Sequence, residues 1–328
     1  MSSLNDRLAV CHRFCVAPMM DCTDRHDRAF LRQFSRHTLL YTEMLSSGAL
    51  LHGDAAHLLR FSPEEQPVAL QLGGGDPDDL AAAALLAEQA GYREVNLNLG
   101  CPSDRVQGGN FGACLMKEPE RVAACVAAMI ATVQIPVTVK CRIGVDGRDS
   151  DDELLDFVER LAEAGCRTFI IHARIAVLQG LTPKQNREIP PLNYARVLRV
   201  KRAFPELEIV INGGIDSLET AANLLRELDG VMLGREAYGN PFLLSKVDET
   251  FFGEPPNAKS RLDYLGGFLP YVERELRQGT PLRHITRHML GLFRGQPGGR
   301  RFRRHLSVYG NRRGAPLEVL LDAMTHVA

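Results

Sequence analysis

A closed (β/α)8 barrel, an α/β fold, is the architecture that the sequence predicts. Eight short runs of β-branched or aliphatic residues recur along the chain, and helix-like segments separate them. Several of these segments open on acidic residues and stop at a glycine, as the two ends of a helix prefer. Eight strands that alternate with helices are typical of a TIM barrel. A doubly wound open sheet is the alternative, but it requires a glycine-rich fingerprint after the first strand, where residues 17–21 read APMMD.

The predicted strands occupy residues 14–18, 39–42, 68–72, 94–99, 136–141, 168–172, 208–212 and 230–234. Between the third and fourth strands, Asp78 opens an Ala/Leu-rich segment that stops at Gly91. Between the fifth and sixth strands, Asp151 opens a second segment that stops at Gly165. Both segments are predicted to be helices that return the chain to the start of the next parallel strand.

Length and composition favour one large domain and a small appendix, which we place at residues 1–245 and 256–328. Of the 328 residues, 45% are hydrophobic, enough for a full core. No run of about 18 apolar residues could span a membrane, and residues 1–7 lack the features of a secretory signal. The eight cysteines are scattered without a C-x-x-C pair, so neither a disulfide framework nor a metal site is indicated. We therefore expect a cytoplasmic protein.

The charge of the chain is unevenly distributed. Residues 256–328 contain 13 Lys and Arg against 5 Asp and Glu, a local charge of +8. Subtracting these from the totals of 39 and 40 leaves 26 and 35, or −9, for residues 1–255. A basic tail on an acidic body points to a polyanionic partner.

The active site of a TIM barrel lies at the carboxyl ends of its strands, and the residues predicted there are unusually polar. For Thr42, Glu43 and Arg142, hydrogen bonding to a neighbouring loop is the favoured interpretation. Convergence of so many polar residues on one rim nevertheless indicates a site. In chain order they are Met19, Asp21, Thr42, Glu43, Gln71, Asn98, Cys101, Lys140, Arg142, His172, Asn212 and Arg235.

The most informative stretch is residues 97–103, which read LNLGCPS. Alternation along the fourth strand puts Asn96 and Asn98 on one face. Buried carboxamides are costly unless they are hydrogen-bonded, and we expect a bound ligand to satisfy these two. Gly100 and Pro102 fix the backbone around Cys101, which predicts a reaction centre; a structural cysteine in a turn is the alternative.

The loops after the last two strands indicate a phosphate site. Asn212, Gly213 and Gly214 follow the seventh strand, and Gly234 and Arg235 follow the eighth. Barrels commonly bind phosphate with backbone amides in these loops, and the arginine could add two parallel hydrogen bonds. We therefore expect the ligand to be a phosphorylated cofactor or a sugar phosphate.

Gln71 and Lys140 favour a flavin as that cofactor. An amide can serve the donor and acceptor edges of a pyrimidine ring, and a lysine at its N1–O2 side stabilises the negative charge of reduced flavin. Two alternatives stay open for Lys140. It could pair with a carboxylate inside the barrel, or form a Schiff base as in an aldolase.

Several motifs together resemble the tRNA-dihydrouridine synthases, FMN enzymes that reduce uridine in tRNA. They are residues 17–19 (APM), 97–103 (LNLGCPS), 111–116 (FGACLM), 172–174 (HAR) and 211–215 (INGGI). Residues 181–192 (LTPKQNREIPPL) and 288–293 (HMLGLF) further resemble the bacterial A-type subfamily, which modifies uridines 20 and 20a of the D-loop. The chain departs from the subfamily pattern at Ile175, Val177 and Phe302, where polar, basic or tryptophan residues are usual.

The resemblance implies a role for each residue that matches the family's motifs. Asn98 would orient the flipped-out uracil, and Cys101 would deliver a proton to C5 as hydride from flavin N5 reaches C6. NADPH, or NADH, is the implied reductant; because no dinucleotide fingerprint is present, it is expected to enter the same mouth. The implied FMN site consists of Pro18, Met19, Met20, Gln71, Lys140, His172, Asn212, Gly213, Gly214, Gly234 and Arg235.

The resemblance also implies that the barrel is followed by a small all-helical domain that grips tRNA at its D-loop and elbow region, which matches the basic tail. Phosphate neutralisation plus one aromatic, Phe302, fits recognition of tRNA shape; a solvated helix face is the alternative. No obligate protein partner is indicated. The expected RNA contacts are Lys184, Gln185, Arg187, Arg300, Arg301, Arg303 and Arg304.

Two other functional classes compete with this interpretation. A flavin-dependent reductase of a free pyrimidine would share the barrel, the cysteine and the cofactor, but it would not explain the charge of the tail. A non-catalytic tRNA-binding protein would explain the tail, but not Cys101, Lys140 and His172 at strand ends.

Overall fold

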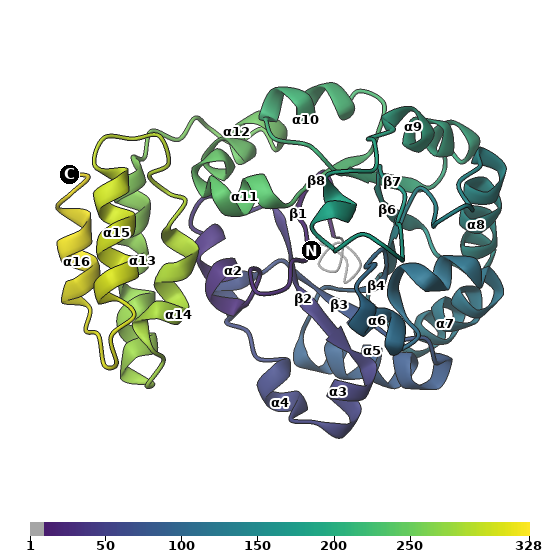
Figure 1. Cartoon of the computed structure of the whole chain (residues 1–328), viewed down its shortest axis with the longest axis horizontal. Helices are drawn as coiled ribbons and strands as arrows, with labels where there is room; N and C mark the ends of the chain where they lie inside the picture. The colour runs from purple at the N-terminus through teal and green to yellow at the C-terminus, as the bar shows by residue number, and fades with distance from the viewer. Residues whose placement is uncertain (1–9) are drawn as a thin grey trace, which may run out of the picture.

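The computed structural model describes residues 10–328 and contains a closed barrel of eight parallel strands (Figure 1). The predicted fold class is confirmed, and apart from β2 the strand ends agree with the prediction within two residues. The strands are β1 (Phe14–Val16), β2 (Leu39–Ser46), β3 (Val68–Gly73), β4 (Glu94–Leu99), β5 (Val137–Arg142), β6 (Thr168–His172), β7 (Glu208–Asn212) and β8 (Gly230–Leu233).

Helices cover the outside of the barrel (Figure 1). The Asp76 carboxylate caps α5, which ends at Gly91 with a positive φ of 94°. Ser150 and Glu153 form a capping box at the start of α8. The helices of the barrel region are α2 (Arg25–Leu31), α3 (Ser47–His52), α4 (Ala55–Leu58), α5 (Pro77–Ala90), α6 (Asp104–Gly108), α7 (Pro119–Thr132), α8 (Asp151–Glu163), α9 (Tyr194–Ala203), α10 (Leu218–Leu224), α11 (Arg235–Gly239) and α12 (Val247–Phe251), with short 3-10 turns η1 (Pro63–Glu65), η2 (Gly112–Lys117), η3 (Gln185–Arg187) and η4 (Pro241–Lys246).

Strand β2 is longer than the predicted run of residues 39–42. Its register with β3 shifts between Tyr41 and Met44, so Thr42 and Glu43 form an irregularity inside the strand. The Thr42 hydroxyl accepts the backbone N–H of Gln71 at 3.0 Å and donates to the Glu43 carbonyl at 2.7 Å. The strand therefore continues past the polar pair, through an irregularity of a kind that is common at the rims of barrels.

The interior of the barrel combines apolar side chains with buried polar ones, and it is charged at its amino-terminal end. A separate cluster of buried residues, which includes Cys15, Tyr41 and Met232, belongs to the middle. Below it, His12 Nε2 lies 2.5 Å from Glu94 Oε2, and His12 Nδ1 lies 2.9 Å from Glu208 Oε2. Burial opposes the imidazolium, but the two carboxylates raise the pKa of His12 to about 10. This ion cluster closes the floor of the barrel.

The carboxy-terminal tail folds into helices that lie beside the barrel (Figure 1). Phe268 and Tyr264 of α13 pack on Phe30 and Phe34, with ring centroids 5.2 and 4.5 Å apart. The predicted limits of the two domains, 1–245 and 256–328, stay a prediction, and α12 lies between them. The helices of the tail are α13 (Arg261–Arg277), α14 (Leu282–Thr286), α15 (Gly299–Tyr309) and α16 (Glu318–Met324), with the 3-10 turn η5 (Arg287–Met289).

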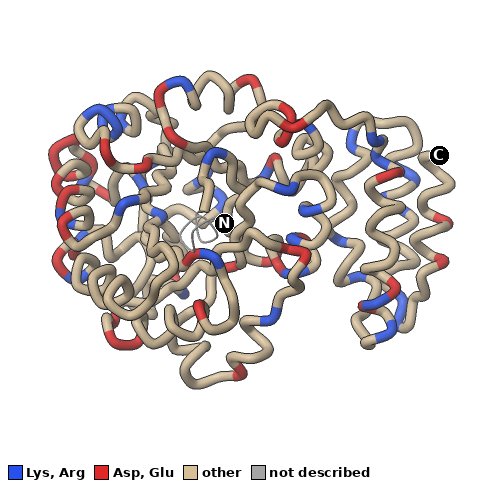
Figure 2. Tube along the Cα trace, turned by 180° about the vertical axis from the view of Figure 1, so that it is seen from behind, with Lys and Arg blue, Asp and Glu red and all other residues tan. Residues whose placement is uncertain are grey.

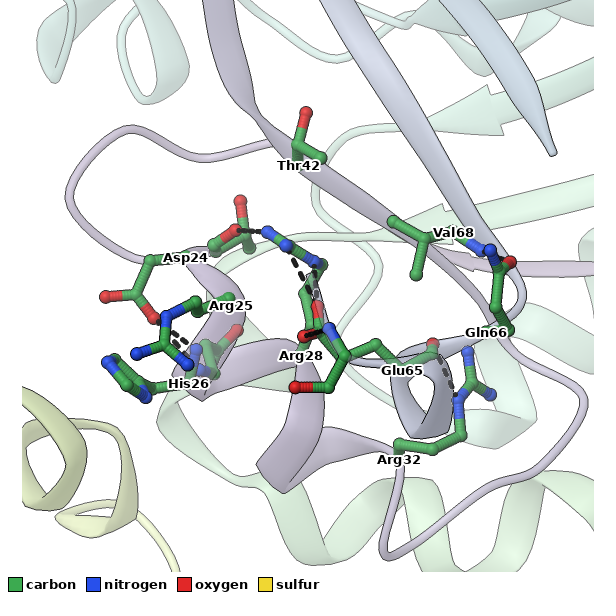
Figure 3. Close-up of polar contacts among 12 residues, drawn as sticks. Asp24, Arg25, His26, Arg28, Arg32, Thr42, Glu65, Gln66 and Val68 are labelled. Atoms are coloured by element: carbon green, nitrogen blue, oxygen red, sulfur yellow. Dashed lines mark hydrogen bonds and ion pairs between the residues drawn. The ribbon is translucent and has the colours of Figure 1, made fainter. Parts of the chain in front are cut away.

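Helix α2 links the barrel to the tail through polar contacts. Figure 3 shows Arg28 of α2 directed at Glu65 and Arg25 on the side toward the tail. Arg28 Nε donates to Glu65 Oε2 at 2.9 Å, and both side chains are buried. Toward the tail, Arg25 pairs with Glu275 of α13, and His26 Nδ1 lies 2.8 Å from the Tyr271 hydroxyl. The helix is therefore held from both sides.

Within residues 10–328, no helix is long and apolar enough to cross a membrane. Residues 1–7, on which the prediction of no secretory signal rests, lie outside the described part of the chain. Among the cysteines, Cys15, Cys125, Cys141 and Cys166 are buried thiols, as expected of core residues. In the same described range, no group of three or more His, Cys, Asp and Glu side chains could hold a metal ion.

Candidate active site

The carboxyl ends of five consecutive strands bring polar side chains to one rim of the barrel. Cross-strand register places Asn98 of β4 beside Lys140 of β5, and His172 of β6 beside Asn212 of β7. Gln71 of β3 lies beside Asn96 of β4. Because the strands are parallel, the rim combines amide, amine and imidazole groups in a single place.

The buried amides are hydrogen-bonded to the protein itself. Asn96 Nδ2 donates to Thr138 Oγ1 and Gln71 Nε2 donates to Asn96 Oδ1, both at 2.8 Å. Asn98 Nδ2 donates to Gln71 Oε1 at 2.8 Å. The expectation that Asn96 needs a bound ligand is therefore wrong, because neighbouring strands supply both of its partners. Asn98 is only partly buried, so it stands at the open end of this row.

Cys101 sits on a turn whose backbone Asn98 fixes. Asn98 Oδ1 accepts the N–H of Gly100 at 3.1 Å and the N–H of Cys101 at 3.0 Å. Gly112 has a positive φ of 80°, and a Cβ there would lie 2.7 Å from the Cys101 carbonyl oxygen. The thiol is partly exposed and lies 3.6 Å from Ser103 Oγ. A thiol held this way is accessible to a ligand on a rigid backbone.

Arg142 ties the cysteine turn to the long loop after β6. Its Nε donates to the Gly100 carbonyl at 3.1 Å, and its Nη1 donates to the carbonyls of Ile175 and Asn186 at 3.2 and 3.0 Å. The interpretation that Arg142 is a strand-end residue hydrogen-bonding a loop is confirmed. Ile175 contributes its backbone to this contact, and its apolar side chain packs against the core.

Lys140 of β5 and His172 of β6 are two basic residues whose pKa values are both lowered. Burial, helped by the Arg142 guanidinium, lowers the pKa of Lys140 to about 8. Lys140 forms no ion pair with any described residue. Residues 10–328 therefore do not provide the carboxylate partner that was the alternative. Burial, and then the cations Arg142 and Lys140, lowers the pKa of His172 far below its usual range. Among the residues that the structure describes, the buried Nδ1 of the neutral His172 ring has no hydrogen-bond partner.

The glycines of the loop after β7 differ in backbone conformation from the glycine after β8. Gly213 and Gly214 have positive φ values of 112° and 69°. A Cβ at Gly213 would lie 3.1 Å from His172 Nε2, a tight contact, and the positive φ would strain a larger residue there. Gly234 precedes α11, which Arg235 opens. Arg235 is exposed, and its Nη1 lies 2.9 Å from Glu188 Oε1 in the loop after β6. The guanidinium that is predicted to bind phosphate is therefore already paired with a carboxylate.

The loop after β1 borders the same rim. Pro18 and Met19 are partly buried, whereas Met20 is 55% exposed. The Met19 N–H donates to Thr23 Oγ1 at 3.0 Å. Asp21 has a positive φ of 61°, and its N–H donates to Glu43 Oε1 at 2.5 Å. Glu43 thus supports this loop, as expected for a strand-side residue that bonds a neighbouring loop.

The loop after β6 carries a group of exposed polar residues. Lys184, Gln185 and Arg187 are all exposed, while Asn186 between them is fully buried. Asn186 Nδ2 donates to the Val177 carbonyl and Asn186 Oδ1 accepts the Val177 N–H, both at 2.8 Å. The buried amide therefore holds the loop in a fixed shape from which its neighbours project.

The arginine cluster of α15 faces solvent, but its aromatic residue does not. Arg300, Arg301, Arg303 and Arg304 are exposed. Phe302 is completely buried and packs edge-on against Phe293, with ring centroids 4.8 Å apart. The expectation that Phe302 contributes an aromatic contact to RNA is therefore wrong, because helical periodicity turns this residue toward the core. The cluster offers charge alone.

Several residues behind the rim escaped the sequence analysis. Glu94 and Thr138 reach the amide row from inside the barrel, and Gln107 of α6 donates to the carbonyls of Pro102 and Leu178 at 2.9 and 3.0 Å. For Glu94, the sequence offers only a weak signal, a glutamate at the start of an otherwise apolar strand. Their partners depend on strand register and loop packing, which sequence alone does not provide.

A closed barrel with a cysteine, a lysine and an imidazole at the carboxyl ends of its strands has the organisation of a (β/α)8-barrel enzyme. A family model described as "Dihydrouridine synthase (Dus)" matches residues 15–327. The chain belongs to the dihydrouridine synthase family.

Relatives in other bacteria are similar over almost the whole chain. The tRNA-dihydrouridine(20/20a) synthase of Pseudomonas aeruginosa is 57% identical over 99% of this chain and 98% of its own length. The protein of the same name from Vibrio cholerae is 56% identical over 96% of both chains, and that of Escherichia coli K12 is 57% identical over 96% of this chain and 92% of its own.

Among solved structures, a 2-naphthoyl-CoA reductase in complex with 2-naphthoyl-CoA is similar with a TM-score of 0.57 and 11% sequence identity. The similarity covers 72% of this chain and 50% of the reductase chain. At this identity the likeness concerns the fold alone.

Proposed function

We propose that this protein is a flavin-dependent oxidoreductase that reduces the C5=C6 bond of uridine to 5,6-dihydrouridine in tRNA. The observation that carries the proposal is the family match over residues 15–327. Relatives of 57% identity bear names that specify positions 20 and 20a, so the D-loop uridines at these positions are the proposed targets.

The proposed cofactor is FMN, and features of the rim support the fit. Gly213 and Gly214 have positive φ values in a loop where barrels commonly bind phosphate, and Arg235 adds a guanidinium once Glu188 moves aside. The buried Nδ1 of His172 has no hydrogen-bond partner within residues 10–328, so a polar ligand would satisfy it. The residues proposed to hold FMN are Pro18, Met19, Met20, Gln71, Lys140, His172, Asn212, Gly213, Gly214, Gly234 and Arg235.

Bound FMN would supply a hydride for C6 of the uracil. Addition at C6 leaves enolate-like charge on the ring, which must be neutralised by a proton at C5. We assign this proton to the Cys101 thiol, which acts as a general acid and must stay protonated until the hydride arrives. Asn98 uses its oxygen to hold the Cys101 backbone and one N–H to hold Gln71. Its second N–H is left to orient the uracil.

The protein would hold the tRNA at its D-loop and elbow region. Six exposed cations, Lys184, Arg187, Arg300, Arg301, Arg303 and Arg304, form no ion pair with any residue in 10–328 and are free to neutralise phosphates. Gln185 adds a hydrogen-bonding side chain beside them. Because the target base must leave its loop to reach a barrel mouth, this grip is needed before the chemistry can occur. The proposed reductant, NADPH or NADH, would use the same mouth before the tRNA binds.

The decisive assay is dihydrouridine formation by flavin-loaded protein with NADPH on tRNA transcripts that carry U-to-C changes at D-loop positions. Product that is lost only when positions 20 and 20a are both replaced supports the proposal. Turnover of free uridine at a similar rate would favour a free-pyrimidine reductase instead. No product on transcripts or on native hypomodified tRNA would contradict the proposal.

Replacement of Cys101 tests the assigned proton donor. We expect Cys101→Ala to slow the single-turnover reaction of reduced flavin with tRNA by about 10²–10⁴-fold, because general acid catalysis contributes that much. Reduction by NADPH and flavin content should be unchanged. Cys22→Ala is the matched control, since Cys22 is another partly exposed free cysteine. Wild-type rates in Cys101→Ala would exclude Cys101 as the donor.

A further inference from the structure

A continuous row of hydrogen bonds connects the charged floor of the barrel to the backbone of Cys101. Thr138 Oγ1 donates to Glu94 Oε1 at 2.6 Å and accepts Asn96 Nδ2 at 2.8 Å. Asn96 Oδ1 accepts Gln71 Nε2, and Gln71 Oε1 accepts Asn98 Nδ2, each at 2.8 Å. Asn98 Oδ1 then accepts the N–H of Cys101 at 3.0 Å. We call these five side chains, Glu94, Thr138, Asn96, Gln71 and Asn98, the amide relay.

The direction of every bond in the relay is fixed from both ends. At the floor, Glu94 accepts from Tyr41 and Thr138 and contacts His12, so it acts as an acceptor. The single hydroxyl hydrogen of Thr138 goes to Glu94, so Thr138 has only an acceptor to offer Asn96. At the rim, a backbone N–H can only donate. Turning any one amide over would therefore set two donors or two acceptors against each other.

Burial makes such a mismatch costly. Glu94, Thr138 and Asn96 are fully buried, and Gln71 is 1% exposed, so water does not compensate a lost partner. Strand register brings the members together, since Gln71 pairs with Asn96 and Asn96 pairs with Thr138. The relay is thus built from consecutive strands β3, β4 and β5.

We propose that Glu94, Thr138 and Asn96 are positioning residues for the reaction. Through the relay they hold the amides of Gln71 and Asn98 in one orientation, with one N–H of each left for the ligand, and they fix the backbone that carries Cys101. A carboxylate at the floor thereby determines which hydrogen-bonding groups the mouth presents. The assignment of a ligand to Gln71 and Asn98 rests on the proposed function, whereas the hold on Cys101 does not.

The test compares two substitutions at Thr138 in the full-length purified protein. Thr138→Val keeps the volume of the side chain and removes the hydroxyl, while Thr138→Ser keeps the hydroxyl and removes a methyl group. If Thr138 served only to fill space, the serine variant would be the more perturbed of the two. The relay requires the reverse order.

The first measurement is backbone hydrogen exchange at Gly100 and Cys101, which needs neither cofactor nor tRNA. We expect Thr138→Val to speed this exchange by about tenfold and Thr138→Ser to leave it near the wild-type rate. Tyr41→Phe is the matched control, because it removes a different hydrogen bond to Glu94 at 2.8 Å that lies outside the relay. Its Gly100 and Cys101 exchange should stay at the wild-type rate.

The second measurement is the dissociation constant for FMN, which should rise about tenfold in Thr138→Val and stay within twofold in Thr138→Ser and Tyr41→Phe. Equal effects of the two Thr138 variants on exchange, or a larger effect of Thr138→Ser, would overturn the proposal. If the wild-type protein formed no dihydrouridine, the proposed function would fail while the exchange experiment still decided the relay.

Discussion

At the scale of single residues, the half-buried lysine of β5 carries a positive charge that no described carboxylate balances. Its pKa is lowered to about 8, so the ammonium form declines within an accessible pH range. From pH 7 to pH 9 the protonated fraction falls from about 0.9 to about 0.1. The positive charge that would stabilise an anionic flavin is therefore lost between pH 7 and pH 9.

We predict that the affinity for FMN falls as the pH rises from 7 to 9, by up to about tenfold, and that Lys140→Met abolishes most of this dependence. Fluorescence titration of the flavin-free protein with FMN measures this affinity at each pH. The stability of that protein should change in the opposite direction, because the unfolded chain holds the Lys140 proton to higher pH and stability then rises with pH. A pH dependence of FMN binding that is identical in Lys140→Met would contradict the assignment.

At the scale of elements, helix α6 and the loop after β6 hold the cysteine turn between them. Gln107 of α6 joins the carbonyl of Pro102 to that of Leu178, and Arg142 joins the carbonyl of Gly100 to that of Ile175. The two residues that flank Cys101 are thus attached to the same loop. That loop also carries Lys184 and Arg187, so the segment proposed to contact RNA and the turn proposed to carry the proton donor are attached to each other.

We predict that Gln107→Ala lowers the single-turnover rate with tRNA by about tenfold, since two partly buried hydrogen bonds that place the turn are lost. The KM for tRNA and the affinity for FMN should change less than threefold. Gln134→Ala is the control, because Gln134 is an exposed glutamine on the barrel whose side chain makes none of the described hydrogen bonds. A loss that appears only in KM would place Gln107 in RNA binding instead.

The strands themselves could be predicted because apolar runs of four to six residues alternate with capped helices, and β4, β6 and β7 begin and end where expected. Strand β2 was predicted too short, because Thr42 and Glu43 look like a strand end until their register with β3 is known. The partners of Asn96 and the burial of Phe302 likewise depend on how elements pack, which local sequence does not encode. The rim residues follow from fold class, but their connections do not.

At the scale of the whole molecule, the orientation of the helical tail depends on ion pairs at α2. Arg25 and Glu275 are paired with little exposure, and burial of Glu275 is opposed by Arg25, which keeps the pKa of the carboxyl below its ordinary value. Asp24 pairs with Arg287 and with His288, whose Nε2 lies 3.0 Å from Asp24 Oδ1. If the tail binds tRNA as proposed, these ion pairs would set how the RNA meets the barrel mouth.

We predict that Glu275→Ala lowers the free energy of unfolding by about 3 kcal/mol, because it leaves the Arg25 charge without its partner in a poorly hydrated place. Urea unfolding at pH 7 measures the loss. Because the Glu275 pKa is lowered in the folded state, the contribution is present at neutral pH and disappears on acidification, so the difference from wild type should shrink toward pH 3. Glu273→Ala, an exposed neighbour on the same helix, is expected to change stability by less than about 0.5 kcal/mol.

The distribution of charge over the molecule predicts where tRNA binds. Figure 2 shows basic residues gathered on the tail and acidic residues along the outer helices at the opposite end of the barrel. The four arginines of α15 are exposed, whereas Phe302 between them is buried, so we expect their contribution to be electrostatic. Phosphate contacts of this kind weaken with salt in proportion to the number of cations involved.

We therefore predict that Arg301→Ala combined with Arg304→Ala raises the KM for tRNA at least tenfold, leaves the single-turnover rate at saturating tRNA unchanged, and reduces the slope of log affinity against log salt concentration by about 1 for each arginine removed. Arg226→Ala is the control, since Arg226 is an exposed arginine of the barrel. A wild-type salt slope in the double variant would place the RNA contact elsewhere, whereas a loss of rate at saturation would mean that α15 also aims the base at Cys101.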